Sequence, residues 1–100
     1  MLRHIVFWKF KKDANGDSSE KNTKEAKRRL ATLPALIPQI RKYELGIAQN
    51  TGPAAMDLSL ISEFDDRQAL DSYINHPDHK KVSEFISTIR EARAVVDYEI

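Results

Sequence analysis

The stretch His4-Ile-Val-Phe-Trp-Lys-Phe10 decides the fold of this chain. Its β-branched and aromatic residues are typical of a β-strand, in which successive side chains point to opposite faces of a sheet. Both alternating sets are apolar: one contains Val6, Trp8 and Phe10, and the other contains Ile5 and Phe7. We therefore predict a strand that is covered by protein on both of its faces.

The residues after this strand predict a turn and then a helix. Asp13-Ala-Asn-Gly16 is a polar turn cluster, and Asp17-Ser-Ser-Glu20 has the pattern of a capping box, in which two side chains bond two free amides at a helix start. Proline lacks an amide donor and clashes with the preceding turn, so Pro34 predicts that the helix stops or kinks around Leu33. Apolar residues recur at helical spacing up to this point, at Ala26, Leu30, Leu33 and Ile37.

Two further strands are predicted in the middle of the chain. Residues 40–49 carry alternating apolar side chains, and so do residues 57–64. The segment Asn50-Thr-Gly-Pro53, which lies between them, has the composition of a turn. We therefore predict two neighbouring antiparallel strands.

A second helix is predicted after these strands, with a break inside it. Asp65 or Asp66 can cap its start, and the apolar side chains up to Ile74 lie on one face. The segment Asn75-His-Pro-Asp78 interrupts the pattern, and the helical spacing of apolar residues then resumes and continues to Ile89. Residues 94–100 alternate again and predict the last strand.

The resulting order of elements, β-α-β-β-α-β, is that of the ferredoxin-like α+β fold. One hundred residues is a common size for one domain, so we expect a single domain over residues 1–100. Two right-handed crossovers would place both helices on one face of a four-stranded antiparallel sheet. The other face is partly apolar and would be bare in a monomer, so we predict that a second copy of the chain covers it in a homodimer.

Composition and charge exclude several classes of function. The formal net charge is +1, which gives the chain no long-range attraction for nucleic acid, and no apolar run approaches the roughly 18 to 20 residues that span a bilayer. The RNA-recognition domain shares the element order, but residues 57–64 lack its Lys/Arg-Gly-aromatic pattern. Without cysteine there is no disulfide framework. We expect a cytoplasmic protein that binds neither nucleic acid nor membrane.

Four stretches that together span nearly the whole chain carry a family resemblance. They are Arg3-His-Ile-Val-Phe-Trp-Lys-Phe10, Leu60-Ile-Ser-Glu-Phe-Asp-Asp66, Tyr73-Ile-Asn-His-Pro-Asp-His79 and Val95-Val-Asp-Tyr98. In these stretches the chain resembles the stress-responsive α/β-barrel domain proteins, also called Dabb proteins. The His-Pro-x-His motif after an aromatic helix is the most specific of the four.

The resemblance implies a ferredoxin-like protomer whose sheet packs on that of a second copy, forming a dimeric α+β barrel. Most members look like proteins without an assigned activity, and some are associated with stress. The chain is accordingly expected to hold a small apolar molecule or to serve a structural role under stress. One plant branch of the family acts as a polyketide cyclase without a cofactor, which leaves a cofactor-independent enzyme as the alternative. Cofactor-free monooxygenases share the dimeric barrel, but their asparagine-tryptophan-histidine arrangement is not matched here.

His79 and Tyr73 are the candidate catalytic residues. His79 is expected in the first turn of the resumed helix, where the positive end of the helix dipole favours the neutral imidazole that a general base needs. In the cyclase branch, the tyrosine and the second histidine of a Tyr-x-x-His-Pro-x-His pattern form an acid/base pair, and Tyr73 and His79 occupy these positions. The resemblance thus implies a histidine that takes a proton next to a carbonyl while the tyrosine hydroxyl bonds the oxygen. In the other interpretation both residues are structural and lie at the edge of the core.

The first strand also supplies candidate ligand-binding residues. His4, Val6 and Trp8 share one face and would line a cavity between sheet and helices. On the neighbouring strand this chain places Leu58 or Leu60 where the cyclase pocket has a polar group. We therefore expect a smaller and more apolar pocket, which suits a small apolar molecule better than a long polyketide.

Neither a metal site nor a cofactor is predicted. His76 and His79 lie three residues apart, but no third ligand follows at a recognisable spacing. His76 is instead expected to order the break at Pro77.

Overall fold

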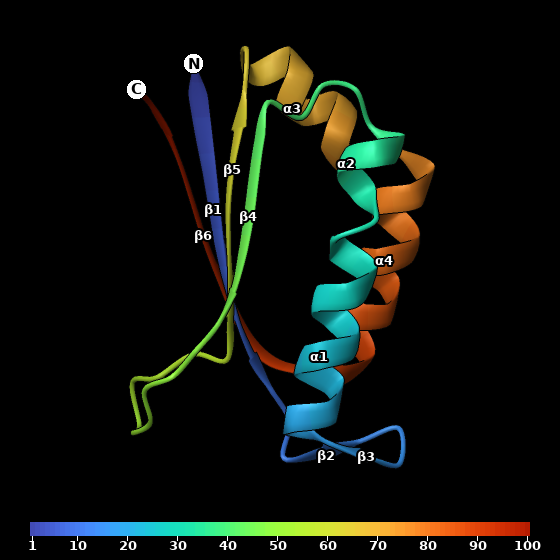
Figure 1. Ribbon diagram of the computed structural model, residues 1–100, viewed down its shortest axis with the longest axis vertical. Coiled ribbons are helices and arrows are strands. Elements are labelled where there is room, and N and C mark those ends of the chain that lie inside the picture. The colour runs from blue at the N-terminus through green and yellow to red at the C-terminus, as the bar shows by residue number, and fades with distance from the viewer.

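The computed structural model describes all of residues 1–100 and shows one sheet with helices packed against it (Figure 1). The sheet contains β1 (Leu2–Phe10), β4 (Lys42–Ile47), β5 (Leu58–Phe64) and β6 (Arg90–Glu99). Each neighbouring pair is antiparallel, and the strand order is β4-β5-β1-β6. This arrangement confirms the predicted ferredoxin-like α+β fold, with the first strand in the interior of the sheet.

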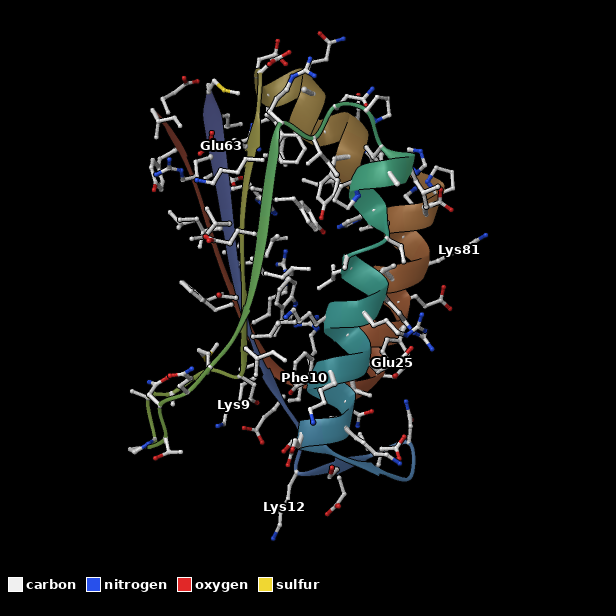
Figure 2. The ribbon with its side chains drawn as sticks, viewed as in Figure 1. Lys9, Phe10, Lys12, Glu25, Glu63 and Lys81 are labelled. Atoms are coloured by element: carbon white, nitrogen blue, oxygen red, sulfur yellow. The ribbon has the colours of Figure 1, made fainter.

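All helices lie on one side of the sheet (Figure 1). α1 (Ser19–Leu30) and α2 (Leu33–Leu36) precede β4, whereas α3 (Arg67–Ile74) and α4 (Pro77–Ile89) connect β5 to β6. Neighbouring side chains of β1 alternate as expected, because Phe10 points toward the helices and Lys9 points away from them (Figure 2). The helices thus cover one apolar face of the central strand.

The register of β1 and β5 determines which side chains reach the core. Val6 is paired with Leu60, and Trp8 is paired with Leu58. None of these four side chains is more than 5% exposed. Burying an apolar side chain of this kind contributes about 1.5 to 3 kcal/mol to folding. The same register places these residues beneath the helices, where Val6, Trp8 and Leu60 line the candidate site.

α1 begins one residue later than the capping-box pattern predicts. Its N-cap is Ser18, whose Oγ accepts a hydrogen bond of 3.2 Å from the amide of Lys21. Asp17 belongs instead to β3 (Asp17–Ser18), which pairs with β2 (Asp13–Ala14). The residues between them, Asn15 and Gly16, both have positive φ, 53° and 80°, as the tight turn of a two-residue hairpin requires. The predicted polar turn is therefore a short hairpin that leads into the helix.

Pro34 marks the start of a helix rather than the end of one. α1 already ends at Leu30, and Pro34 lies in the first turn of α2. Proline is tolerated there because the first amides of a helix have no partner within the helix. The predicted helix break is present, but it lies between Leu30 and Leu33 rather than after Leu33.

The second predicted break lies between α3 and α4. Asp66 caps α3 by accepting a hydrogen bond from the amide of Ala69, and α3 ends at Ile74. His76 is the N-cap of α4, and its Nδ1 accepts a hydrogen bond of 3.1 Å from the amide of Asp78. This contact confirms that His76 orders the break.

The strands differ from the prediction at their ends. β1 begins at Leu2 rather than His4, and β4 is shorter than residues 40–49. The largest correction is to β6, which begins at Arg90 rather than at residue 94. It is longer because it pairs with the whole of β1, from Glu99 opposite Leu2 to Arg90 opposite Phe10. Residues 90–93 are consequently part of the sheet.

The sheet face away from the helices is uncovered in the isolated chain, as predicted. Phe7 is 40% exposed on this face, Val96 is 50% exposed and Tyr98 is 39% exposed. Ile5 and Ile61 lie on the same face, where they are paired with each other and are partly buried.

No helix of the structure is both long enough and apolar enough to cross a membrane.

Candidate functional site

A cavity of about 270 Å³ lies between the sheet and α4. Its floor consists of His4, Val6 and Trp8 of β1 and Leu60 of β5. The volume lies just below the usual range for small-molecule pockets, about 300 to 1,000 Å³. Four of the five residues predicted to line a pocket therefore do so together.

Leu58 is the fifth, and it does not line this cavity. Its side chain is buried on the same face of the sheet, directly opposite Trp8. Leu60, which is paired with the smaller Val6, does line the cavity. Of the two leucines that the sequence left open, Leu60 is therefore the one that lines the cavity.

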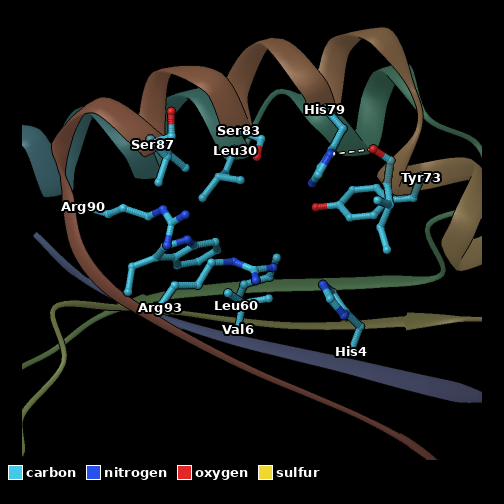
Figure 3. A pocket seen from close by; sticks show the side chains of 13 residues that line it. His4, Val6, Leu30, Leu60, Tyr73, His79, Ser83, Ser87, Arg90 and Arg93 are labelled. Atoms are coloured by element: carbon cyan, nitrogen blue, oxygen red, sulfur yellow. Dashed lines mark hydrogen bonds between the residues drawn. The ribbon is translucent and has the colours of Figure 1, made fainter.

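The opposite wall is one stripe of α4. His79, Ser83 and Ser87 are spaced four residues apart and thus share a face of the helix, which is turned toward the cavity (Figure 3). Ser87 Oγ donates a hydrogen bond to the carbonyl of Glu84 within the helix. The wall is therefore polar, unlike the apolar pocket expected from the sequence.

The hydrogen bond of His79 fixes its tautomer. Its Nδ1 lies 3.0 Å from the carbonyl oxygen of Ile74. A carbonyl oxygen only accepts, so Nδ1 carries the hydrogen and Nε2 of the neutral ring keeps a lone pair. Figure 3 shows that the second ring nitrogen faces the interior of the cavity. Burial, together with the nearby His4 and Arg93, lowers the pKa of His79 and outweighs the opposite effect of the Ile74 carbonyl.

Tyr73 lies beside His79 at the same end of the cavity (Figure 3). The centroids of the two rings are 4.5 Å apart. The Tyr73 hydroxyl is 3.0 Å from the hydroxyl of Tyr43 on β4, and burial raises the pKa of Tyr73 to about 12. A hydroxyl with this pKa stays protonated at neutral pH and can donate a hydrogen bond to a ligand. Tyr43 was identified from the sequence only as part of a strand pattern.

His4 is held by a carboxylate from the neighbouring strand. Its Nδ1 donates to Asp97 Oδ1 at 2.5 Å, and Asp97 lies directly opposite His4 in the pairing of β1 with β6. Arg67 Nη1 donates to the other oxygen of Asp97 at 3.2 Å. Burial alone would raise the pKa of Asp97, but the bonds from His4 and Arg67 outweigh it, and the pKa lies below its usual value. Nε2 of His4 is thereby left for the cavity.

Two arginines that the sequence did not single out complete the site. Arg90 and Arg93, both from β6, also line the cavity, with Arg90 at the end away from Tyr73 and His79 and the guanidinium of Arg93 nearer the middle (Figure 3). The strand predicted from the sequence began only after them, so no local pattern placed them beside Trp8. The only signal in the sequence was the charged segment Arg90-Glu-Ala-Arg93, which directly follows α4.

No group of three or more His, Asp or Glu side chains in residues 1–100 is arranged to hold a metal ion. The Nδ1 atoms of His76 and His79 are engaged in separate hydrogen bonds, with the amide of Asp78 and the carbonyl of Ile74. The two histidines therefore serve different purposes, one in the helix break and one in the cavity.

The family model of the stress-responsive A/B barrel domain matches residues 2–100, and the chain belongs to this family. The resemblance inferred from the sequence is thus confirmed. No curated protein matches the chain.

Solved structures of the same fold support this assignment. A dimeric protein of unknown function with a ferredoxin-like fold from Bacteroides fragilis is 34% identical, with 99% of this chain and 95% of that chain covered and a TM-score of 0.82. A dimeric ferredoxin-like protein of unknown function from Thermobifida fusca is 21% identical, covering 99% and 90%, with the same TM-score of 0.82. A hydroxynitrile lyase from Passiflora edulis is also 21% identical, covering 99% and 92%, with a TM-score of 0.78. At 21% identity, these last two show the fold alone.

Proposed function

We propose that the protein binds a small molecule in this cavity and transfers a proton on it without a cofactor, with His79 as the general base. The tautomer of His79 carries this proposal, because the Ile74 carbonyl holds the hydrogen on Nδ1 and leaves the Nε2 lone pair facing the cavity. A lowered pKa keeps the ring neutral near pH 7. A general base needs this form and an accessible nitrogen.

The proposed step is removal of a proton from a carbon next to a carbonyl group. Nε2 of His79 takes the proton, the C–H electron pair forms the enolate, and the negative charge moves to the carbonyl oxygen. The protonated Tyr73 hydroxyl donates a hydrogen bond to that oxygen while Tyr43 holds it in place. The imidazolium then returns the proton to the product. His4, whose ring centroid is 6.3 Å from that of Tyr73, positions a polar group of the ligand through its free Nε2.

The family and the fold do not by themselves select this reaction. Structures with this fold include a hydroxynitrile lyase and dimeric proteins of unknown function. Function therefore has to be argued from the site rather than from the fold. The small volume of the cavity favours a compact substrate over a long polyketide chain.

A second candidate function is that of a protein that holds a small, partly apolar molecule without changing it, in the stress-related role that the family name describes. The apolar floor of Val6, Trp8 and Leu60 favours this function. The same cavity would be used, so the two candidates differ only in whether His79 moves a proton.

We also propose that the chain forms a homodimer through the open face of its sheet. Phe7, Val96 and Tyr98 expose apolar surface there, and the Bacteroides fragilis relative is described as dimeric. A second copy is the natural cover, because an isologous contact places the same patch on both sides. The cavity lies on the other face and would stay accessible.

Proton transfer can be tested by deuterium exchange. Acetoacetate and methyl acetoacetate carry an acidic methylene next to two carbonyl groups, and proton NMR in D₂O follows the loss of its signal. We expect the wild-type protein to accelerate exchange in at least one of the two probes and His79→Asn to remove the acceleration. His76→Asn is the matched control, because asparagine is also a good N-cap. An exchange rate that is equal in wild type and His79→Asn would rule out the general base and leave the holding function.

A further inference from the structure

Two arginines of this chain lack a partner, and both line the cavity. The chain contains seven arginines. Five of them bond carboxylates, in the pairs Arg3–Glu63, Arg28–Glu25, Arg29–Glu25, Arg41–Asp65 and Arg67–Asp97. The side chains of the remaining two, Arg90 and Arg93, form no hydrogen bond or ion pair with the protein, and both line the cavity. A guanidinium has five donors and stays charged, so two of them beside a cavity are available to a ligand.

A bulge in β6 places both arginines on one face of the sheet. In a regular strand, residues three apart point to opposite faces. Here Ala92 is paired with Lys9 and Arg90 with Phe10, so Glu91 has no partner and the register shifts at this point. Arg90 and Arg93 thereby lie opposite Phe10 and Trp8, two residues of the face that the helices cover. Bulges redirect side chains in this way.

No acidic side chain neutralises the pair. Glu91 has bulged out of the strand pairing and forms no ion pair. Asp97, the nearest carboxylate of β6 on the helix-covered face, already accepts hydrogen bonds from His4 and Arg67. Burial and the adjacent charge of Arg90 lower the pKa of Arg93 and outweigh the opposite effects of Asp97 and Tyr73. A bound anion would relieve the repulsion between the two cations.

We propose that Arg90 and Arg93 bind the carboxylate of a small organic acid, so that the ligand of this cavity is an oxo acid rather than a neutral apolar molecule. The planar guanidinium matches a carboxylate in a bidentate pair. Trp8 and Val6 supply apolar contact for the carbon chain, and Ser83, whose hydroxyl has no partner within the protein, can bond a further oxygen.

A carboxylate fits this end of the cavity better than a phosphate. Phosphate sites commonly use the positive N-terminus of a helix. Arg90 follows directly after Ile89, the last residue of α4, so the helix presents its negative end here. A ligand with a single negative charge is repelled less by this end than a dianion.

This inference rests on the proposed function for the placement of the reacting carbon. Figure 3 shows Arg90 at one end of the cavity, His79 and Tyr73 at the other, and the guanidinium of Arg93 between them. An acid held by the arginines would point its carbonyl and the adjacent carbon toward Nε2 of His79. Carboxylate binding itself does not need His79, so the two ideas can fail separately.

The single tryptophan of the chain, Trp8, lies in the cavity and reports binding by its fluorescence. Titrations would compare acetoacetate, its neutral methyl ester and inorganic phosphate on the wild-type protein. They would be repeated with Arg90→Gln, Arg93→Gln, His79→Asn and the control Arg41→Gln, whose arginine pairs with Asp65 on the surface. Thermal unfolding of each variant would verify that it is folded.

We expect acetoacetate to bind wild type more tightly than the ester, and Arg93→Gln to weaken acetoacetate roughly ten- to hundred-fold while leaving the ester unchanged. Arg41→Gln should bind acetoacetate as wild type does, whereas His79→Asn changes the cavity lining but should still prefer acetoacetate to the ester. The inference would be overturned if wild type bound acid and ester equally, or bound phosphate more tightly than acetoacetate. It would also be overturned if both arginine variants were folded and bound acetoacetate with unchanged affinity. If wild type prefers acetoacetate to the ester and loses this preference in Arg93→Gln, but shows no proton exchange, the carboxylate site stands and the proposed catalysis does not.

Discussion

The rings of Tyr73 and His79 lie 4.5 Å apart, at an interplanar angle of 56°, although they belong to two different helices. The break that brings them together is made by His76 and Pro77, because the cap on α4 ends one helix and begins the next within three residues. A continuous helix would place residues six apart on different faces. The helix break is thus part of the site as well as of the fold.

We expect His79 to titrate below its usual pKa of 6.5. Proton NMR of its ring across pH 4 to 8, with His79→Gln to assign the signal, measures this. Burial disfavours the charged ring in the folded state. A pKa of 6.5 or higher would show that the ring is solvated and would remove the physical basis for a general base.

The same shift makes stability depend on pH. Below about pH 6.5 the unfolded chain binds a proton at this histidine, whereas the folded ring stays neutral until its lower pKa is reached. The contribution of His79 is therefore complete above about pH 6.5 and is lost as the pH falls through the lowered pKa. Urea denaturation at pH 7.5 and pH 5 should show a smaller drop in unfolding free energy for His79→Gln than for wild type, and an identical drop would contradict the prediction.

Tyr73→Phe and Tyr43→Phe should affect proton exchange differently. Removing the Tyr73 hydroxyl removes the donor to the developing oxyanion, and we expect exchange in the dicarbonyl probes to slow by about 10²-fold. Tyr43→Phe removes only the group that orients Tyr73, through the 3.0 Å bond between the hydroxyls, so the loss should be below about tenfold. Equal losses in the two variants would mean that the tyrosine pair acts only as a structural unit.

Two adjacent valines on β6 test the proposed dimer. Val96 is 50% exposed on the open face of the sheet, and Val95 is 48% exposed on the other face. We expect Val96→Asp to convert the dimer to a monomer in light scattering, because a buried unpaired carboxylate opposes association. Val95→Asp is the matched control and should leave the mass unchanged. The open face is not the interface if both variants, or neither, change the mass.

Replacement of His76 should destabilise the protein without a direct effect on chemistry. His76→Ala removes the acceptor for the Asp78 amide at the start of α4, and we expect a loss of about 0.5 to 2 kcal/mol in unfolding free energy. His76→Asn keeps an acceptor and should lose much less. Chemical denaturation measures both, and an alanine variant as stable as the asparagine variant would show that the cap contributes nothing.

Local pattern alone determined the elements of this protein. The alternation in β1, the spacing in α1 and α4 and the caps at Asp66 and His76 are properties of residues within a few positions of one another. They predicted the order of strands and helices, the uncovered apolar face and the position of Tyr73 and His79 around a helix break. They also predicted that His4, Val6 and Trp8 share one wall, but left open whether Leu58 or Leu60 joins them.

Only the tertiary structure decided the polar half of the site. The contact of His4 with Asp97 depends on the register between the first and last strands, which are more than ninety residues apart. Arg90 and Arg93 share a face only because Glu91 bulges out of that pairing, and Tyr43 meets Tyr73 only when the helices pack on the sheet. The spacing of apolar residues along the sequence determines which face of its own strand or helix a side chain occupies. Register and bulges depend on pairing between distant strands, which local pattern does not encode.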